Sequence, residues 1–387
     1  MTSEEQNSRR PVEDEVVPAR PRRRWRWIVA AVLLLVLAAF AANAGYYLGS
    51  ASSGEFCANC HIIRPSVDVW QVSTHRNIPC TACHGSALTL DPETQRTHWG
   101  RLYRQITGNL PRNLALKDRH VDALTERCIA CHQQAGAAWL SGGHSMTYAD
   151  VFLNPEQNRT VLLHDDCLRC HGMYYDQGGV ESLVQPVNTA GPWSFVDPDM
   201  AARPAIPCIT CHRMHVPGVP AARPDYGAPR RIAHTRDAAV DSLAFYDRRE
   251  KISISLQDLP LPRLRHKGRR VRRSPDPRQA LCYQCHAPET SYHVGSGDDR
   301  TPLGVHEGIS CLACHSPHSL DAKASCAECH PKMSNCGLDV EKMDTTFRSP
   351  DSPHNIHWVR CEDCHTTGVP PRRRQGVQDA SRLPDSW

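Results

Sequence analysis

The stretch S-T-H-R-N-I-P-C-T-A-C-H at Ser73–His84 ends in the pattern that decides the fold of this chain, C-x-x-C-H. The pattern occurs nine times among 387 residues and uses 18 of the 19 cysteines, which leaves Cys336 over. In chain order the motif residues are Cys57, Cys60 and His61; Cys80, Cys83 and His84; Cys128, Cys131 and His132; Cys167, Cys170 and His171; Cys208, Cys211 and His212; Cys282, Cys285 and His286; Cys311, Cys314 and His315; Cys326, Cys329 and His330; and Cys361, Cys364 and His365. A repeat of this kind requires a group that uses two thiols and one imidazole.

Covalently attached haem is that group. Two thiols three positions apart can form thioethers to the two vinyl groups of one porphyrin, and the next residue is then the proximal imidazole of the iron. Zinc half-sites also use C-x-x-C, but they place no demand on the following residue, and a disulfide ladder leaves the histidines unexplained. Because only 22 of 387 residues are histidine, nine such followers by chance have a probability of roughly 10⁻¹¹. The sequence therefore predicts nine haem c groups.

The leftover thiol, Cys336, has two interpretations: an inert free thiol, or a redox or intermolecular role.

Composition predicts little regular structure around these groups. Aromatic residues make up 6% of the chain and Pro (30) outnumbers Gly (23), which is a poor basis for a large side-chain core. We expect a mainly α protein with much irregular loop, packed around stacked haems. Short helices are predicted at each motif and at Glu93–Thr107, loops at Gln185–Pro207, and one strand at Lys251–Leu256. A net charge of +4 gives no strong field for nucleic acid.

An apolar segment near the N-terminus predicts a single membrane span. Ile28–Leu48 is 21 residues without a charge, about 31 Å as a helix and enough to cross a bilayer. Tryptophans at 25 and 27 and tyrosines at 46 and 47 would mark the two interfaces, and the arginines before the span would hold residues 1–27 in the cytoplasm. A cleaved signal ending at Ala42-Asn43-Ala44 is the competing interpretation. Either way the motifs are exported, so we expect an inner-membrane protein with its haem domain in the periplasm or outside.

Motif spacing suggests two modules. Residues 49–215 hold five motifs and residues 282–365 hold four, while 216–281 is a Pro- and Arg-rich connection and 366–387 a C-terminal tail. The connection contains H-K-G-R-R-V-R-R at His266–Arg273. This basic run is either a solvated loop or a docking patch for an acidic partner or anionic lipid.

Thirteen histidines outside the motifs can supply second axial ligands. His215 and His318 lie three residues after a motif histidine, one helical turn away, so the two imidazoles can serve adjacent haems. Five others stand a few residues before a motif and can hold neighbouring haems together. The predicted ligands are His75, His120, His164, His215, His306, His318 and His357, then His98, His144 and His293, with His234, His266 and His354 as weaker candidates. An iron with two imidazoles has no open position, so such centres exchange electrons at low potential rather than bind substrate.

The region from the membrane span through the third motif resembles the NapC/NirT family of membrane-anchored quinol dehydrogenases. The matching text is G-E-F-C-A-N-C-H at Gly54–His61 and S-T-H-R-N-I-P-C-T-A-C-H at Ser73–His84. The resemblance implies that the first haem lies near a quinol headgroup and that His75 is a distal ligand. Family members usually carry Met two residues after the first motif histidine, where this chain has Ile63, so the distal ligand of that haem passes to Asp68 or to another histidine.

The later text G-V-H-E-G-I-S-C-L-A-C-H-S-P-H at Gly304–His318 resembles the paired motifs of larger multihaem cytochromes, some of which are enzymes. Two functions follow. The first is an electron-transfer protein that passes electrons from quinol through bis-histidine haems to a redox partner in the periplasm or outside the cell. The alternative is a terminal reductase of a small nitrogen or sulfur oxyanion at one five-coordinate haem.

Overall fold

A computed structural model describes residues 22–60, 62–86, 88, 91–109, 116, 118–216, 241–286, 301–322, 326–330 and 356–364. Within these ranges the chain is mainly helical with much irregular loop, which confirms the predicted fold class. The α-helices are α1 (Arg22–Ser50), α2 (Glu55–Ala58), α3 (Arg64–Gln71), α4 (Cys80–His84), α5 (Pro92–Thr107), α6 (Asp118–Cys131), α7 (Gln133–Leu140), α8 (Tyr148–Phe152), α9 (Pro155–Thr160), α10 (Cys167–Cys170), α11 (Val180–Leu183), α13 (Gln279–Cys285) and α14 (Cys361–Cys364).

The remaining elements are short. The 3₁₀ helices are η1 (Gly143–Ser145), η2 (Pro198–Met200), η3 (Cys208–Thr210), η4 (Leu256–Asp258), η5 (Gly304–His306), η6 (Cys311–Ala313) and η7 (Cys326–Glu328). The strands are β1 (Val184–Gln185), β2 (Ser194–Phe195), β3 (Ala244–Asp247), β4 (Ile252–Ser255), β5 (Arg265–His266) and β6 (Arg269–Arg270), paired antiparallel as β1–β2, β3–β4 and β5–β6.

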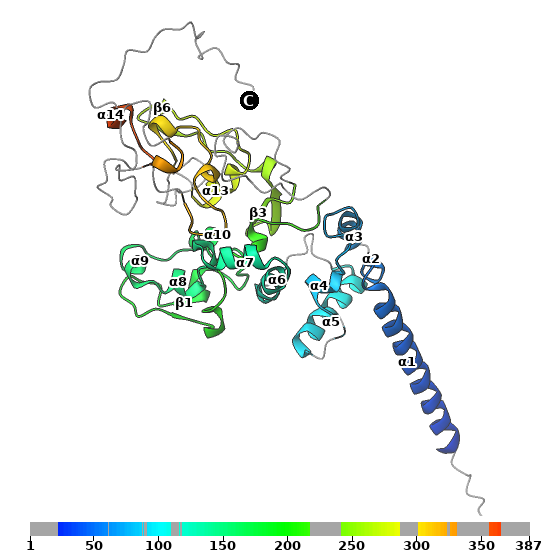
Figure 1. The fold of residues 1–387 in the computed structure, drawn as a ribbon. Coiled ribbons are helices and arrows are strands. Elements are labelled where there is room, and N and C mark those ends of the chain that lie inside the picture. Colours follow the sequence, from blue (N-terminus) through cyan, green and yellow to red (C-terminus); the bar gives the residue numbers. More distant parts are fainter. Residues whose placement is uncertain are drawn as a thin grey trace, which may run out of the picture.

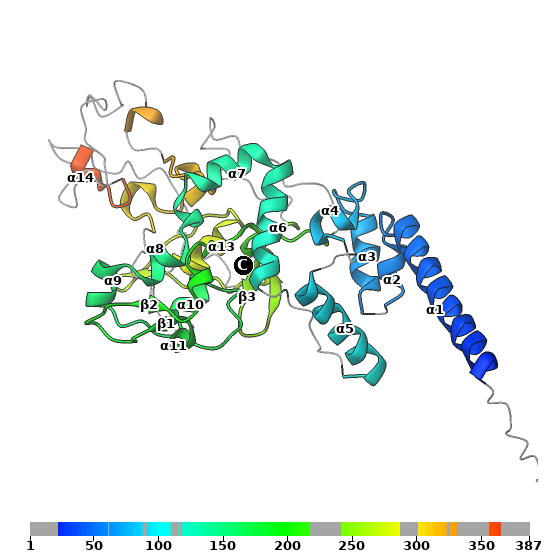
Figure 2. The same cartoon turned by 90° about the horizontal axis from the view of Figure 1, so that it is seen from below.

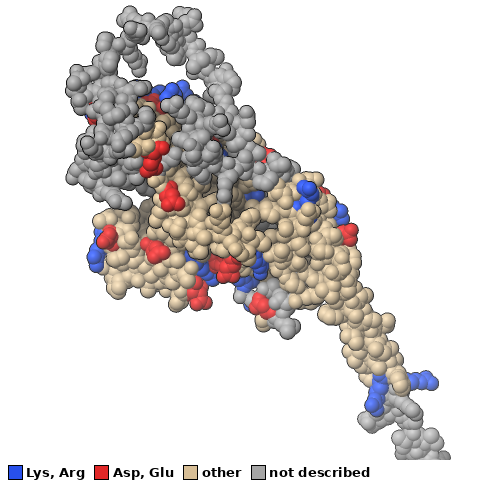
Figure 3. Space-filling view, in the orientation of Figure 1, with Lys and Arg blue, Asp and Glu red and all other residues tan. Residues whose placement is uncertain are grey.

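The first helix is long and apolar enough to cross a membrane. The qualifying part of α1 is Arg24–Ser50, within which an 18-residue window has a mean hydropathy of 2.4. The side chains of α1 are largely exposed because the rest of the chain does not cover them. Figure 1 shows α1 projecting from the molecule, and Figure 3 shows a surface free of charge along it with basic side chains at its outer end. This agrees with the predicted anchor.

The first cysteine of every motif lies in a helix, and eight of these nine helices have seven residues or fewer, in agreement with the prediction. In α4, α10, α14, η3, η6 and η7 the first motif cysteine opens the helix, and in α2, α6 and α13 it lies within one. A helical turn brings residues three apart onto one face, so both thiols of a motif can reach the same porphyrin edge. The predicted helix at Glu93–Thr107 is also present as α5, and the predicted strand at Lys251–Leu256 as β4.

Two segments are more ordered than the sequence predicts. Gln185–Pro207 is mostly loop, but it includes β2, which pairs with β1, and η2. The predicted connection contains the hairpin β3–β4, and its Phe245 and Tyr246 are buried in a core with Val121 and Tyr174. Apart from β4, these strands were not predicted, because segments of two to four residues rarely give a reliable period in the sequence and their burial depends on distant partners.

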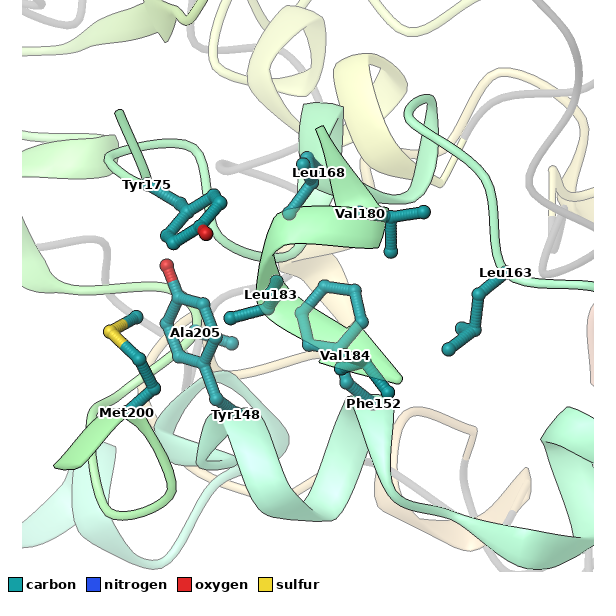
Figure 4. Close-up of a cluster of buried hydrophobic side chains, with 10 residues drawn as sticks. All are labelled: Tyr148, Phe152, Leu163, Leu168, Tyr175, Val180, Leu183, Val184, Met200 and Ala205. Carbon is teal, nitrogen blue, oxygen red and sulfur yellow. The ribbon is translucent and has the colours of Figure 1, made fainter. Parts of the chain in front are cut away.

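One cluster of buried side chains stands apart from the others. It is formed within residues 148–205, chiefly by Phe152, Leu168, Leu183 and Val184, which are almost fully buried (Figure 4). The side chain of Asn158 donates to the Phe152 carbonyl oxygen at 2.8 Å, which ties α9 to α8. Residues 148–205, which we call the middle lobe, hold the fourth motif in a core of side chains.

Candidate haem-binding sites

We number the candidate sites 1 to 9 by the chain order of their motifs. At six of them the motif histidine faces a second histidine from elsewhere in the chain. The ring-centroid distances are 6.0 Å for His84–His215 (site 2), 6.2 Å for His132–His75 (site 3), 5.9 Å for His212–His318 (site 5), 6.3 Å for His286–His144 (site 6), 6.0 Å for His315–His357 (site 7) and 6.5 Å for His330–His306 (site 8).

These distances fit one iron between each pair of rings. A metal–imidazole nitrogen bond is about 2 Å long, so two such bonds and the half-width of each ring separate the centroids by roughly 6 Å. Edge-to-face aromatic pairs can have the same separation, but in all six pairs one ring is a motif histidine and the other lies outside the motifs, as two ligands of one haem iron require. The residues present therefore fit a bis-imidazole haem at sites 2, 3, 5, 6, 7 and 8.

The environment keeps several of these imidazoles neutral, which is the form that binds iron. Burial lowers the pKa of His212 to about 4, with further lowering by the nearby His318 and His132. Burial is also the first cause of the lowered pKa of His84 and of His144. Loss of hydration disfavours the imidazolium in each case. The Nδ1 atoms of His144 and His306 lie 3.1 Å and 2.8 Å from the carbonyl oxygens of Pro317 and Ile356, a contact that orients a ring with Nε2 toward a metal.

The pairing links segments that are far apart in the chain. His144 precedes the fourth motif but faces His286 of the sixth, and His318 follows the seventh motif but faces His212 of the fifth. His215, one turn after His212, faces His84 of the second motif. The segments that carry His215 and His318 thus each contribute to two sites. Contacts across the two predicted modules are extensive, and the division into five and four motifs stays a prediction.

The attachment thiols also meet across sites near the membrane helix. Burial raises the pKa of the Cys57 and Cys83 thiols. Cys80 lies close enough to Cys57 to raise the pKa of the Cys57 thiol further, and Cys131 has the same effect on Cys83. These contacts bring sites 1, 2 and 3 together. Arg127 donates to the Cys83 carbonyl oxygen at 2.7 Å and so joins α6 to α4.

Beyond sites 1, 2 and 3, the next site in space is site 5, which lies beside site 3. Cys128 of site 3 and Cys208 of site 5 are in hydrogen-bond contact through their side chains. Helix α6 also packs against η3, which carries the fifth motif. The order in space therefore differs from the order in sequence.

Site 6 lies between three other sites. Its Cys285 contacts Cys170 of site 4, and its Cys282 contacts Cys311 of site 7, both through the side chains. Cys211 of site 5 lies near both thiols of site 6.

The membrane end of site 1 is built from aromatic contacts. Phe56, beside the first motif cysteine, packs edge-on against Tyr47 of α1 with ring centroids 4.9 Å apart, and Tyr47 is 5% exposed. The Tyr47 hydroxyl lies 3.3 Å from the Ser86 hydroxyl, just after the second motif. Tyr47 therefore packs against the protein, whereas Tyr46 is 47% exposed and suits the predicted interfacial role.

The other predicted site residues have varied positions. His171 is partly buried at the end of α10, His120 lies on α6 near His84, His164 is exposed before α10, and Asp68 is exposed on α3. Their ligation stays a prediction. The following lie outside the described residues or side chains: His61, His98, His234, His293, Cys336, His354, Cys364 and His365.

Sequence reasoning missed a buried polar network between sites 6 and 7. Asp276, with a fully buried side chain, accepts from Arg278 Nε at 2.8 Å and from Ser310 Oγ at 2.7 Å. The Ser310 hydroxyl in turn accepts from the Leu312 amide at 3.2 Å as the cap of η6. Serine directly before a motif is a capping signal, but nothing in the sequence pairs it with Asp276.

Comparison with known proteins points to the same chemistry. Over 169 residues the chain is 25% identical to the cytochrome c-type protein NrfH of Wolinella succinogenes, a match that covers 42% of this chain and 91% of that protein. The chain is thus homologous to a c-type cytochrome. This relationship supports covalent haem c and the resemblance to the NapC/NirT family, and the apolar α1 fits an inner-membrane anchor. No family model matches the chain, and no solved structure matches it.

Proposed function

We propose that this chain is a membrane-anchored nonahaem cytochrome that takes electrons from quinol at site 1 and passes them to a redox partner in the periplasm or outside the cell. The observation that carries the proposal is the set of six facing histidine pairs, 5.9 to 6.5 Å apart. An iron held by two imidazoles has no free position for substrate, so its chemistry is limited to electron exchange.

The chain's own residues have three tasks in this proposal. When bound, each haem supplies a reversible one-electron couple. The cysteines would hold its edge and the paired histidines would supply its nitrogen ligands, while burial lowers the pKa of His84, His144 and His212 and so favours the neutral form that binds iron. The packing of Phe56 on Tyr47 supports entry near the membrane, because it fixes the first motif at the end of α1.

The test uses full-length protein in lipid vesicles. A quinol analogue is expected to reduce the oxidised chain, and its ferric spectrum is expected to be low-spin at the six paired sites. Mass spectrometry should find nine attached haems. Reduction by dithionite but not by quinol would overturn the proposed donor. A high-spin fraction that responds to nitrite, hydroxylamine or cyanide would instead favour the terminal reductase.

A further inference from the structure

The arrangement of the sites in space bears on where electrons can go. Helix α13, which carries the sixth motif, packs against α10 of site 4, against η6 of site 7 and against β3. Strand β3 lies beside site 5, because the Ala244 amide donates to the Cys211 carbonyl oxygen at 3.0 Å. Figures 1 and 2 both show α13 in the interior of the haem-bearing part, with α10 and β3 next to it.

The thiol contacts lead to the same neighbours. A thioether sulfur is bonded to the rim of its porphyrin, so two attachment thiols in contact bring two porphyrin rims together. Cys285 contacts Cys170 and Cys282 contacts Cys311. With Cys211 near both, site 6 has thiols of three other sites around it.

Specific hydrogen bonds hold this arrangement. Arg169, between the two cysteines of site 4, donates through Nη1 to the Gln284 carbonyl oxygen of site 6 at 2.9 Å. Asp276, just before α13, accepts from Ser310 at the start of site 7. His144, the partner of His286, is anchored on the Pro317 carbonyl oxygen, next to the residue that serves site 5.

From these contacts we propose that site 6 is a junction, at which the electron path from sites 1, 2, 3 and 5 divides toward site 4 in the middle lobe and toward site 7. The inference rests on the proposed electron transfer and adds that the chain has two ends where electrons can leave. Each transfer oxidises one iron and reduces the next, and no atom moves. A path in motif order would instead pass from site 3 through site 4 to site 5.

The test is a potentiometric titration of the full-length holoprotein in which individual sites are followed by their low-spin signals. His144→Met replaces an imidazole by a thioether, which raises the potential of site 6 so that it is reduced first. The charge of that electron then lowers the potentials of the sites in contact with it. We expect three shifted neighbours, sites 4, 5 and 7, and a charge-transfer band of methionine-ligated haem that reports the new ligand.

The control is His306→Met, which makes the same replacement at site 8 and is expected to leave sites 4 and 5 unshifted. Two or fewer shifted neighbours in H144M, or shifts at sites 4 and 5 in H306M, would overturn the junction. The titration uses a chemical reductant, so a failure of quinol oxidation leaves its outcome intact.

A second variant decides the question if H144M retains fewer haems than the wild type by mass spectrometry. Arg169→Ala removes a positive charge that lies between sites 4 and 6, so the potentials of both sites should fall together while that of site 7 stays unchanged. Arg159→Ala, at an exposed arginine on α9, controls for the change in net charge. A shift at a single site in R169A would overturn the proposal.

Discussion

The buried pair between sites 6 and 7 offers a sharp test of how the chain positions its haems. In Asp276→Ala the Arg278 guanidinium, whose side chain is 9% exposed, loses a carboxylate that is 0% exposed. Removing one partner of a buried ion pair typically costs about 3–5 kcal/mol. Ser310 loses its acceptor at the same time. We expect the local stability of α13 and η6 to fall by that amount.

Hydrogen exchange by mass spectrometry measures this locally. At a factor of ten for each 1.4 kcal/mol, amide exchange in α13 and η6 should rise by about two to three and a half orders of magnitude. The control is Asp166→Ala, which breaks the partly exposed pair of Asp166 with Arg169, 3.1 Å apart, and should cost less than about 1 kcal/mol. Equal effects of the two variants, or a change below tenfold in D276A, would refute the role of Asp276.

Three further predictions concern other parts of the chain. Gly54→Ala should destabilise α2 by about 1–3 kcal/mol, because Gly54 has φ +78° and a new Cβ would lie 3.0 Å from Val67 Cγ1. Hydrogen exchange of the amides in α2 and α3 measures this loss. The control is Gly100→Ala, where a new Cβ would have nothing within 4 Å and should not reproduce the effect. Hydrogen bonds from Arg269 are the first cause of the lowered pKa of Glu307. The Arg269–Glu307 ion pair, which joins β6 to the start of site 7, therefore stabilises the chain fully above the ordinary pKa of glutamate. That stabilisation is lost as the pH falls through the lowered pKa of Glu307. The melting temperature of Glu307→Gln should therefore lie below that of the wild type at pH 7 and meet it in acid, and a gap that persists in acid would contradict the ion pair. The two imidazole planes cross at 89° at site 2 and at 70° at site 3, but at only 27° at site 5. Nearly perpendicular planes leave two iron d orbitals close in energy, so electron paramagnetic resonance should give highly anisotropic low-spin signals for sites 2 and 3 and a rhombic signal for site 5. Rhombic signals at all three sites would be incompatible with these pairs.

The basic run at His266–Arg273 shows how far a local pattern can be interpreted. Its composition allowed either a solvated loop or a docking patch. In the structure it forms the hairpin β5–β6, with Lys267 and Gly268 at φ 47° and 79° in a tight two-residue turn. Two of its arginines, Arg269 and Arg272, are engaged by Glu307. The turn residues were visible in the sequence, but Glu307 lies 38 positions after Arg269 and could not be assigned.

The sequence by itself determined the features that depend only on residues close together in the chain. The reach of two thiols and an imidazole to one porphyrin is set by a five-residue spacing, and a membrane span is set by an uninterrupted apolar run, so both could be predicted. Placement three residues after a motif histidine marked His215 and His318 as candidate ligands in the same way, although it did not say which motif histidine each would face.

Only the tertiary structure decided those partners. It brings His75 to His132, His144 to His286 and His318 to His212, and it places site 3 beside site 5. The second axial position of an iron accepts an imidazole from any distance along the chain, so spacing carries no information about it. The packing of α6, α13 and η3 around their shared thiols supplies that choice.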